Sequence, residues 1–191
     1  MQIHQLSVSY LAEQDRVLVR VKSSSSEEIR LWLTRRLMLG LWPLLTKLLT
    51  NHLLKLEAAG RSLDGADESL KQMLADFRKE EFLRQADFDT PFDEADGQMP
   101  LGPEPLLITD VDATPIADGQ LRLSFNEHLP HVDPRTFQVD LQPAVMQGLM
   151  HLLEQALARA QWSEPFGSSL PSESASLADS HEALRRPRFL N

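Results

Sequence analysis

Two histidines and two carboxylates lie close together in the segment Glu127-His128-x-x-His131-x-Asp133. Imidazole nitrogens and carboxylate oxygens at this spacing can hold zinc or another divalent ion. His128, His131 and Asp133 are therefore candidate metal ligands, and they would serve a small metal-dependent enzyme. The sequence has no HExxH helix motif, and solvated loop histidines explain the same residues, so we take the second interpretation as the default and expect no cofactor.

Other familiar catalytic patterns are missing from the sequence. There is no cysteine, which excludes thiolate chemistry and disulfides. There is no GxSxG elbow and no glycine-rich phosphate loop. Whether the chain is an enzyme is left open by these absences, and our expectation is that it is not one.

A basic surface with an aromatic residue is predicted in the first third of the chain. If the valines of RVLVRVK point inward, then Arg20, Lys22, Arg30 and Trp32 point outward, with Arg35 and Arg36 close by. Such a surface can bind phosphate, nucleic acid or an acidic peptide. The alternative, which we prefer, is an ordinary charged sheet face with Trp32 covered by another helix or a second chain. The net charge of −9 further argues against nucleic acid.

A second candidate for partner binding lies in the last thirty residues. The segment after Trp162 is rich in serine and proline, which predicts an extended or disordered tail at 162–191. Near its end comes a compact basic and apolar cluster made of Arg185, Arg186, Arg188, Phe189 and Leu190. A segment of this kind could dock on a partner or on a neighbouring copy of the chain.

Two stretches of the sequence share one pattern of elements. Three strands of alternating apolar residues precede a helix in residues 1–60 and again in 105–161. The helices also share the pattern GLxxLL, at Gly40–Leu45 and Gly148–Leu153. The sequence therefore predicts an α+β fold, in which two βββα repeats form a mostly antiparallel sheet packed by helices. Residues 61–104 would form an inserted helix and an acidic linker.

The first repeat helix is apolar around most of its circumference between Leu37 and Leu56. A helix covered by a sheet alone needs only a narrow apolar stripe. This helix must therefore be sandwiched by the inserted helix and the second repeat, or it must contact a partner. We also expect a kink at Pro43, and a cavity beside that kink would make the protein a carrier of apolar ligands.

Charge is distributed unevenly along the chain. Residues 1–61 carry nine Lys or Arg against five Asp or Glu, whereas 62–104 carry four against twelve. Surfaces of opposite charge could pair across a two-fold axis, so we expect self-association or a protein partner. The apolar stretch at 37–49 is too short to span a membrane, and we expect a cytoplasmic protein. The leading prediction is a non-catalytic interaction or adaptor protein.

Overall fold

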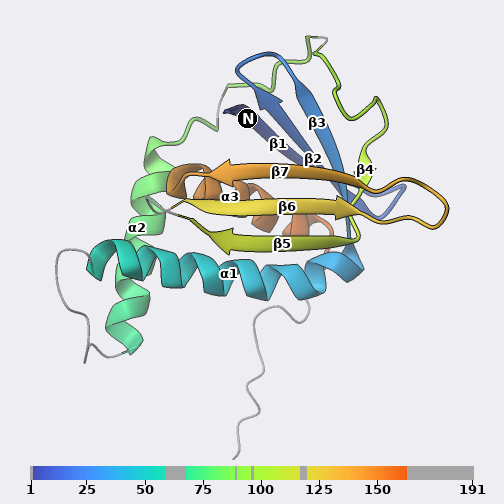
Figure 1. Ribbon diagram of the computed structural model, residues 1–191. Coiled ribbons are helices and arrows are strands. Elements are labelled where there is room, and N and C mark those ends of the chain that lie inside the picture. Colours follow the sequence, from blue (N-terminus) through green and yellow to red (C-terminus); the bar gives the residue numbers. More distant parts are fainter. Residues whose placement is uncertain (1, 59–67, 89, 96, 117–119, 163–191) are drawn as a thin grey trace, which may run out of the picture.

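The computed structural model describes residues 2–58, 68–88, 90–95, 97–116 and 120–162, apart from some side chains of the two longest helices. These residues form an α+β fold with two sheets and three helices (Figure 1). The sequence interpretation expected a single sheet. Two form because the chain leaves the first sheet after residue 107 and enters the second at residue 110.

The first sheet contains strands β1 (Ile3–Leu11), β2 (Arg16–Ser23), β3 (Glu28–Thr34) and the short β4 (Leu106–Leu107). The β2 and β3 strands are antiparallel, with Val19 opposite Leu31. The predicted apolar face is confirmed, because the three valines of β2 and their partners on β3 are all buried. Period-2 alternation of apolar residues therefore located these strands correctly.

The chain crosses between the sheets at residues 106–110. Strand β4 runs parallel to β3, and the Ile108 N–H donates to the Trp32 carbonyl at 3.1 Å. One residue later, the Thr109 N–H donates to the carbonyl of Asn126 in the other sheet at 2.9 Å. The Leu107 N–H is satisfied by the buried carboxylate of Glu127 at 2.7 Å.

The second sheet contains β5 (Asp110–Pro115), β6 (Leu121–Glu127) and β7 (Arg135–Leu141), in that order and antiparallel. Phe125 and Phe137 lie opposite each other, and their rings stack with centroids 6.1 Å apart. The predicted Asp118-Gly119 turn lies outside the described residues.

Helices α1 (Arg35–Ala58) and α3 (Pro143–Arg159) follow the two sets of strands. Thr34 caps α1, since its hydroxyl accepts a hydrogen bond from the Leu37 N–H at 3.2 Å. Pro143 is the first residue of α3, a position that suits proline because its missing N–H is not needed there. The two helices contribute buried leucines and methionines to one core shared with both sheets.

The inserted helix α2 (Glu68–Gln85) contacts both α1 and α3. The predicted apolar stripe was Leu70, Met73, Leu74, Phe77 and Leu83. It is wrong for Met73 and Phe77, which are 67% and 63% exposed, whereas Phe82 packs against the core. The side chains of Leu70 and Leu74 lie outside the described residues. Among the described helices, none is long and apolar enough to cross a membrane.

Candidate functional site

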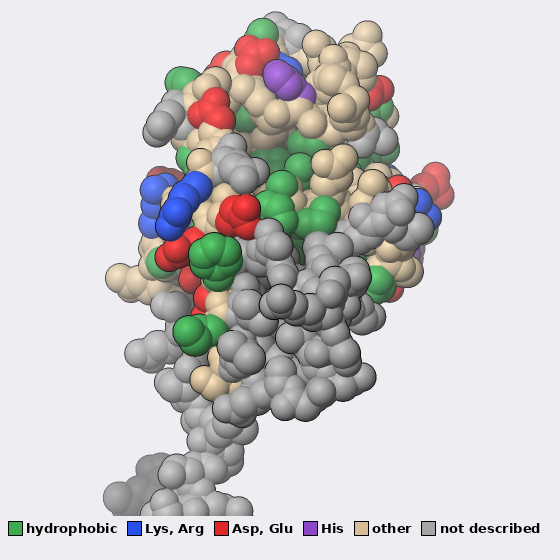
Figure 2. Space-filling model, turned by 90° about the vertical axis from the view of Figure 1, so that its left-hand side faces the viewer, with side chains coloured by type: hydrophobic (Ala, Val, Ile, Leu, Met, Phe, Trp, Pro, Cys, Tyr) green, Lys and Arg blue, Asp and Glu red, His purple; other side chains and the backbone are tan. Residues whose placement is uncertain are grey.

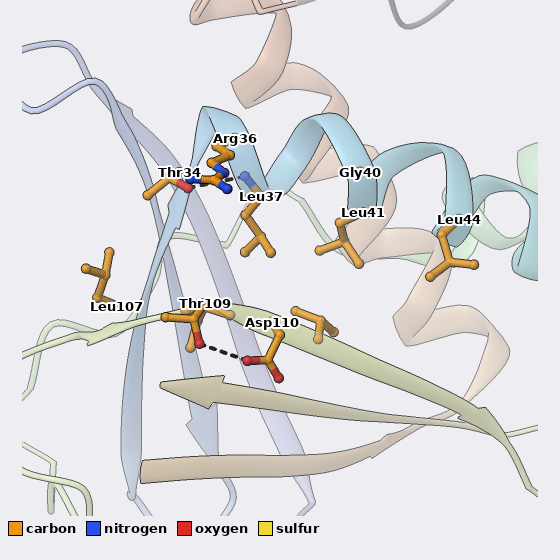
Figure 3. Close-up of a pocket in the computed structure, with 11 residues that line it drawn as sticks. Thr34, Arg36, Leu37, Gly40, Leu41, Leu44, Leu107, Thr109 and Asp110 are labelled. Carbon is orange, nitrogen blue, oxygen red and sulfur yellow. Dashed lines mark hydrogen bonds between the residues drawn. The ribbon is translucent and has the colours of Figure 1, made fainter. Parts of the chain in front are cut away.

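An open groove lies between the first half of α1 and the segment that enters β5 (Figure 3). Its volume is about 640 Å³. One wall is formed by Thr34, Arg36, Leu37, Gly40, Leu41 and Leu44, and the other by Leu107, Ile108, Thr109, Asp110 and Val111. We call it the α1/β5 groove.

The helix wall of the α1/β5 groove is apolar and partly exposed to solvent. Leu37, Leu41 and Leu44 are three or four residues apart, so their side chains line one face of α1. Leu44 is 45% exposed, although leucine is normally buried. A Cβ atom at Gly40 would meet nothing within 4 Å, so this glycine leaves room rather than allowing a close contact. The excess apolar circumference noted in the sequence is thus left partly uncovered.

The strand wall carries an unpaired edge. Within the described part of the chain, β5 pairs with β6 alone, and its other edge runs beside α1 (Figure 1). Alternate residues of an edge strand direct their N–H and C=O groups away from the partner strand. The groove therefore combines an apolar helix face with backbone groups available for hydrogen bonding.

One end of the groove carries a small polar network. The Asp110 carboxylate contacts His128 Nδ1 at 2.9 Å and accepts hydrogen bonds from Thr109 and Asn126. These bonds, above all the one with His128, lower the pKa of Asp110. The ring of His128 is thereby oriented toward a carboxylate of another strand.

The predicted metal ligands His131 and Asp133 do not form a metal site together with His128. His131 and Asp133 are exposed, and His131 has a φ of 65°. No group of three His, Asp or Glu side chains suited to a metal ion occurs among the residues that the structure describes.

A second groove, with a volume of about 570 Å³, lies between α3 and β1, and we call it the α3/β1 groove. Its walls include Ile3 and Leu6 of β1 and Val145 and Gly148 of α3. A third wall carries three aromatic side chains, Phe82, Phe88 and Phe92. Hydrophobic side chains lie in a hollow on the α2 side of the molecule (Figure 2). The glycine of each GLxxLL pattern lines its own groove.

The side-chain amide of Gln5 ties the chain that follows this wall to the edge of β1. Its nitrogen donates to the Pro91 carbonyl at 3.3 Å, and its oxygen accepts from the Asp93 N–H at 3.0 Å.

The predicted basic surface is occupied by the described residues 92–95, 97 and 98, which we call the acidic strap. Lys22 is only 3% exposed, and its ammonium group donates to Asp93 Oδ2 at 2.6 Å and to the carbonyls of Asp93 and Ala95. Arg20 donates to Glu94 at 2.7 Å and lies 4.2 Å from the centre of the Phe92 ring. The charge complementarity expected between two chains is, for these residues, used within one.

The strap also pairs through its backbone. Gln98 exchanges hydrogen bonds with Glu28 and Ser26 at 2.8 and 2.9 Å. A Cβ atom at Gly97 would lie 2.6 Å from the Ser26 carbonyl oxygen, so only glycine allows this approach. Glu28 receives hydrogen bonds from Arg20 and Arg30 at 2.8 Å.

The remaining predicted partner residues are placed as follows. Trp32 is half-buried on β3, and Arg35 and Arg36 are exposed at the start of α1, with Arg36 lining the α1/β5 groove. Arg185, Arg186, Arg188, Phe189 and Leu190 lie outside the described residues. Sequence reasoning missed the groove itself and the strap, although the surplus of leucine on α1 was a signal for the first.

No family model, curated protein or solved structure matches the chain.

Proposed function

We propose that this chain is a non-catalytic interaction or adaptor protein that binds an extended segment of a partner protein in the α1/β5 groove. The observation that carries the proposal is the apolar face of α1 beside the unpaired edge of β5. Leu37, Leu41 and Leu44 form one wall of this groove, and the start of β5 lies in the other.

Binding would occur by addition of a strand to β5. The main chain of the partner would hydrogen-bond to the free edge of β5, and alternate side chains would point toward Leu41 and Leu44. Of the six residues of β5, Asp110 and Val111 line the groove, so pairing with the partner segment would begin there. Main-chain bonds supply affinity in this mode, and the apolar wall selects the side chains.

Selection from a displayed library of random peptides tests this proposal. The full-length chain should enrich peptides with apolar residues at alternate positions. Their binding should be lost in Leu44→Asp, because a carboxylate would then face the apolar side chains. It should persist in Met73→Asp, which changes an equally exposed apolar residue on α2. Peptides that bind both variants equally would refute the groove as the site.

A carrier of small apolar ligands is the second candidate, favoured by the apolar groove wall next to Pro43 in α1. Protein sites usually enclose most of an apolar ligand's surface, whereas this groove leaves Leu44 largely exposed. Binding of a fluorescent fatty acid that depends on Leu44, without any peptide selection, would favour the carrier.

Two broader expectations accompany the proposal. We place the protein in the cytoplasm, and we propose that it can self-associate. Because Arg20 and Lys22 already pair with the acidic strap, self-association would have to use other charges. Sedimentation of the purified chain at low and high salt tests this expectation.

A further inference from the structure

We infer that the resting occupant of the α1/β5 groove is the chain's own segment 185–190, bound within the same molecule, so that a partner must displace it. The inference rests on the proposed function, because it needs the groove to bind extended segments. It identifies the chemistry of the ligand as basic residues alternating with apolar ones.

The described chain ends at the turn between β1 and β2. Trp162 is 1% exposed, and its indole N–H donates to Asp15 Oδ1 at 3.0 Å, the same oxygen that accepts from the Tyr10 hydroxyl. Asp15 precedes Arg16, which pairs with Thr34. Thr34 lines the mouth of the α1/β5 groove. Residues that follow Trp162 therefore start at the end of the first sheet where β3 leads into α1.

The alternation of side chains on β5 matches the alternation in the segment. Asp110 and Asp112 are exposed on one face of β5, whereas Val111 and Ala113 are half-buried on the other. A strand added to this edge continues both faces of the sheet. In the sequence Arg186-Pro187-Arg188-Phe189, both arginines would share the face of the two aspartates.

The other face of the added strand would then carry Pro187 and Phe189 toward the leucines of α1. Cross-strand pairs of opposite charge and of apolar residues both stabilise a sheet. Pro187 lacks an N–H, so it must be a residue whose backbone points away from β5, and the arginines on either side would supply the hydrogen bonds. Arg36 lies on the α1 wall, and its positive charge would repel arginines of the segment. Those arginines would therefore lie on the β5 side of the groove.

The linker between Trp162 and the segment is long enough to let the segment reach the groove. About 22 residues separate Trp162 from Arg185, and a flexible chain of this length spans roughly 25 Å on average. Tethering at this length gives an effective concentration on the order of 1 mM. A segment whose affinity as a free peptide were only about 100 µM would then fill the groove about nine-tenths of the time.

The absence of cysteine from the chain gives a clean test. The full-length double variant Leu44→Cys/Phe189→Cys is oxidised at a protein concentration of about 1 µM. This concentration is far below the effective concentration of the tethered segment at the groove of its own chain. The intramolecular disulfide should form about tenfold faster than in two control pairs, Leu44→Cys/Ser169→Cys and Met73→Cys/Phe189→Cys. The first control is biased against the inference, since Ser169 is closer to Trp162 along the chain.

Exchanging the charges of two residues distinguishes specific docking of the segment in the groove from simple proximity of the two cysteines. Asp112→Lys should slow formation of the disulfide between positions 44 and 189, and adding Arg188→Asp should restore it. Equal rates in all three cysteine pairs would overturn the inference, as would a disulfide formed only between two molecules. If the peptides selected from the library still require Leu44 in that case, the proposed function stands and only the identity of the resting occupant is wrong.

Discussion

Replacing Gln147 by methionine should stabilise the protein. Gln147 lies on α3 and is 1% exposed, and neither its amide nitrogen nor its amide oxygen has a hydrogen-bond partner in the described structure. A buried polar group without a partner loses its bonds to water on folding and gains nothing in return. Methionine has a similar length and no such requirement.

The expected gain follows from the burial of the amide. An unsatisfied buried amide costs about 1–3 kcal/mol, so Gln147→Met should raise the free energy of unfolding by about 2 kcal/mol. For a chain of 191 residues this corresponds to an increase in Tm of about 4–8 °C. Gln147→Glu should act in the opposite direction, because it would bury a charge without a partner.

Urea denaturation followed by circular dichroism measures this difference, with an unchanged m-value showing that the folded state is intact. Gln155→Met is the matched control, since Gln155 is exposed on the same helix and should shift stability by no more than about 0.5 kcal/mol. A loss of stability in Gln147→Met would mean that the amide has a partner, and it would refute the reasoning.

Further predictions concern the acidic strap, the groove and two buried carboxylates. Gly97→Ala should destabilise the fold, because its new Cβ would clash with the Ser26 carbonyl. Gly40→Ala should instead raise the free energy of unfolding by up to about 1 kcal/mol, because alanine favours the helix. Urea denaturation of both variants checks this pair of predictions, and equal effects on stability would contradict it. Burial would raise the pKa values of Glu28 and Glu127, but hydrogen bonds from arginines outweigh it and lower both. Their stabilisation is therefore complete above the ordinary pKa of 4.5 and is lost as the pH falls through the lower folded-state values, so unfolding free energies measured between pH 7 and pH 3 should decrease, less so in Glu28→Gln. A flat profile would contradict this account.

Local patterns predicted the elements well. Alternating apolar residues located β2, β3, β6 and β7, because a strand buries every second side chain. The starts of two helices carry local signals, because Thr34 caps α1 and Pro143 takes the first position of α3. The same order of three strands and a helix occurs twice in the structure, and descent from a duplicated sequence remains an interpretation.

Long-range features could not be read from local patterns. The division into two sheets depends on the change of partner near Ile108 and Thr109, which bond to strands far away in the sequence. The acidic strap depends on Lys22 meeting Asp93 across seventy residues of chain, and the sequence showed only the two opposite charges. The groove was partly foreseeable, since the leucines of α1 exceeded what a sheet could cover, but which of them stay exposed depends on where β5 lies.

Amide chemical shifts of the full-length chain, recorded while a library-selected peptide is added, test the peptide-binding role of the α1/β5 groove most directly. The account predicts changes concentrated in residues 110–114 of β5 and in residues 37–42 and 44 of α1, and their loss in Leu44→Asp. Changes concentrated instead around the acidic strap or the α3/β1 groove, with β5 unaffected, would contradict it.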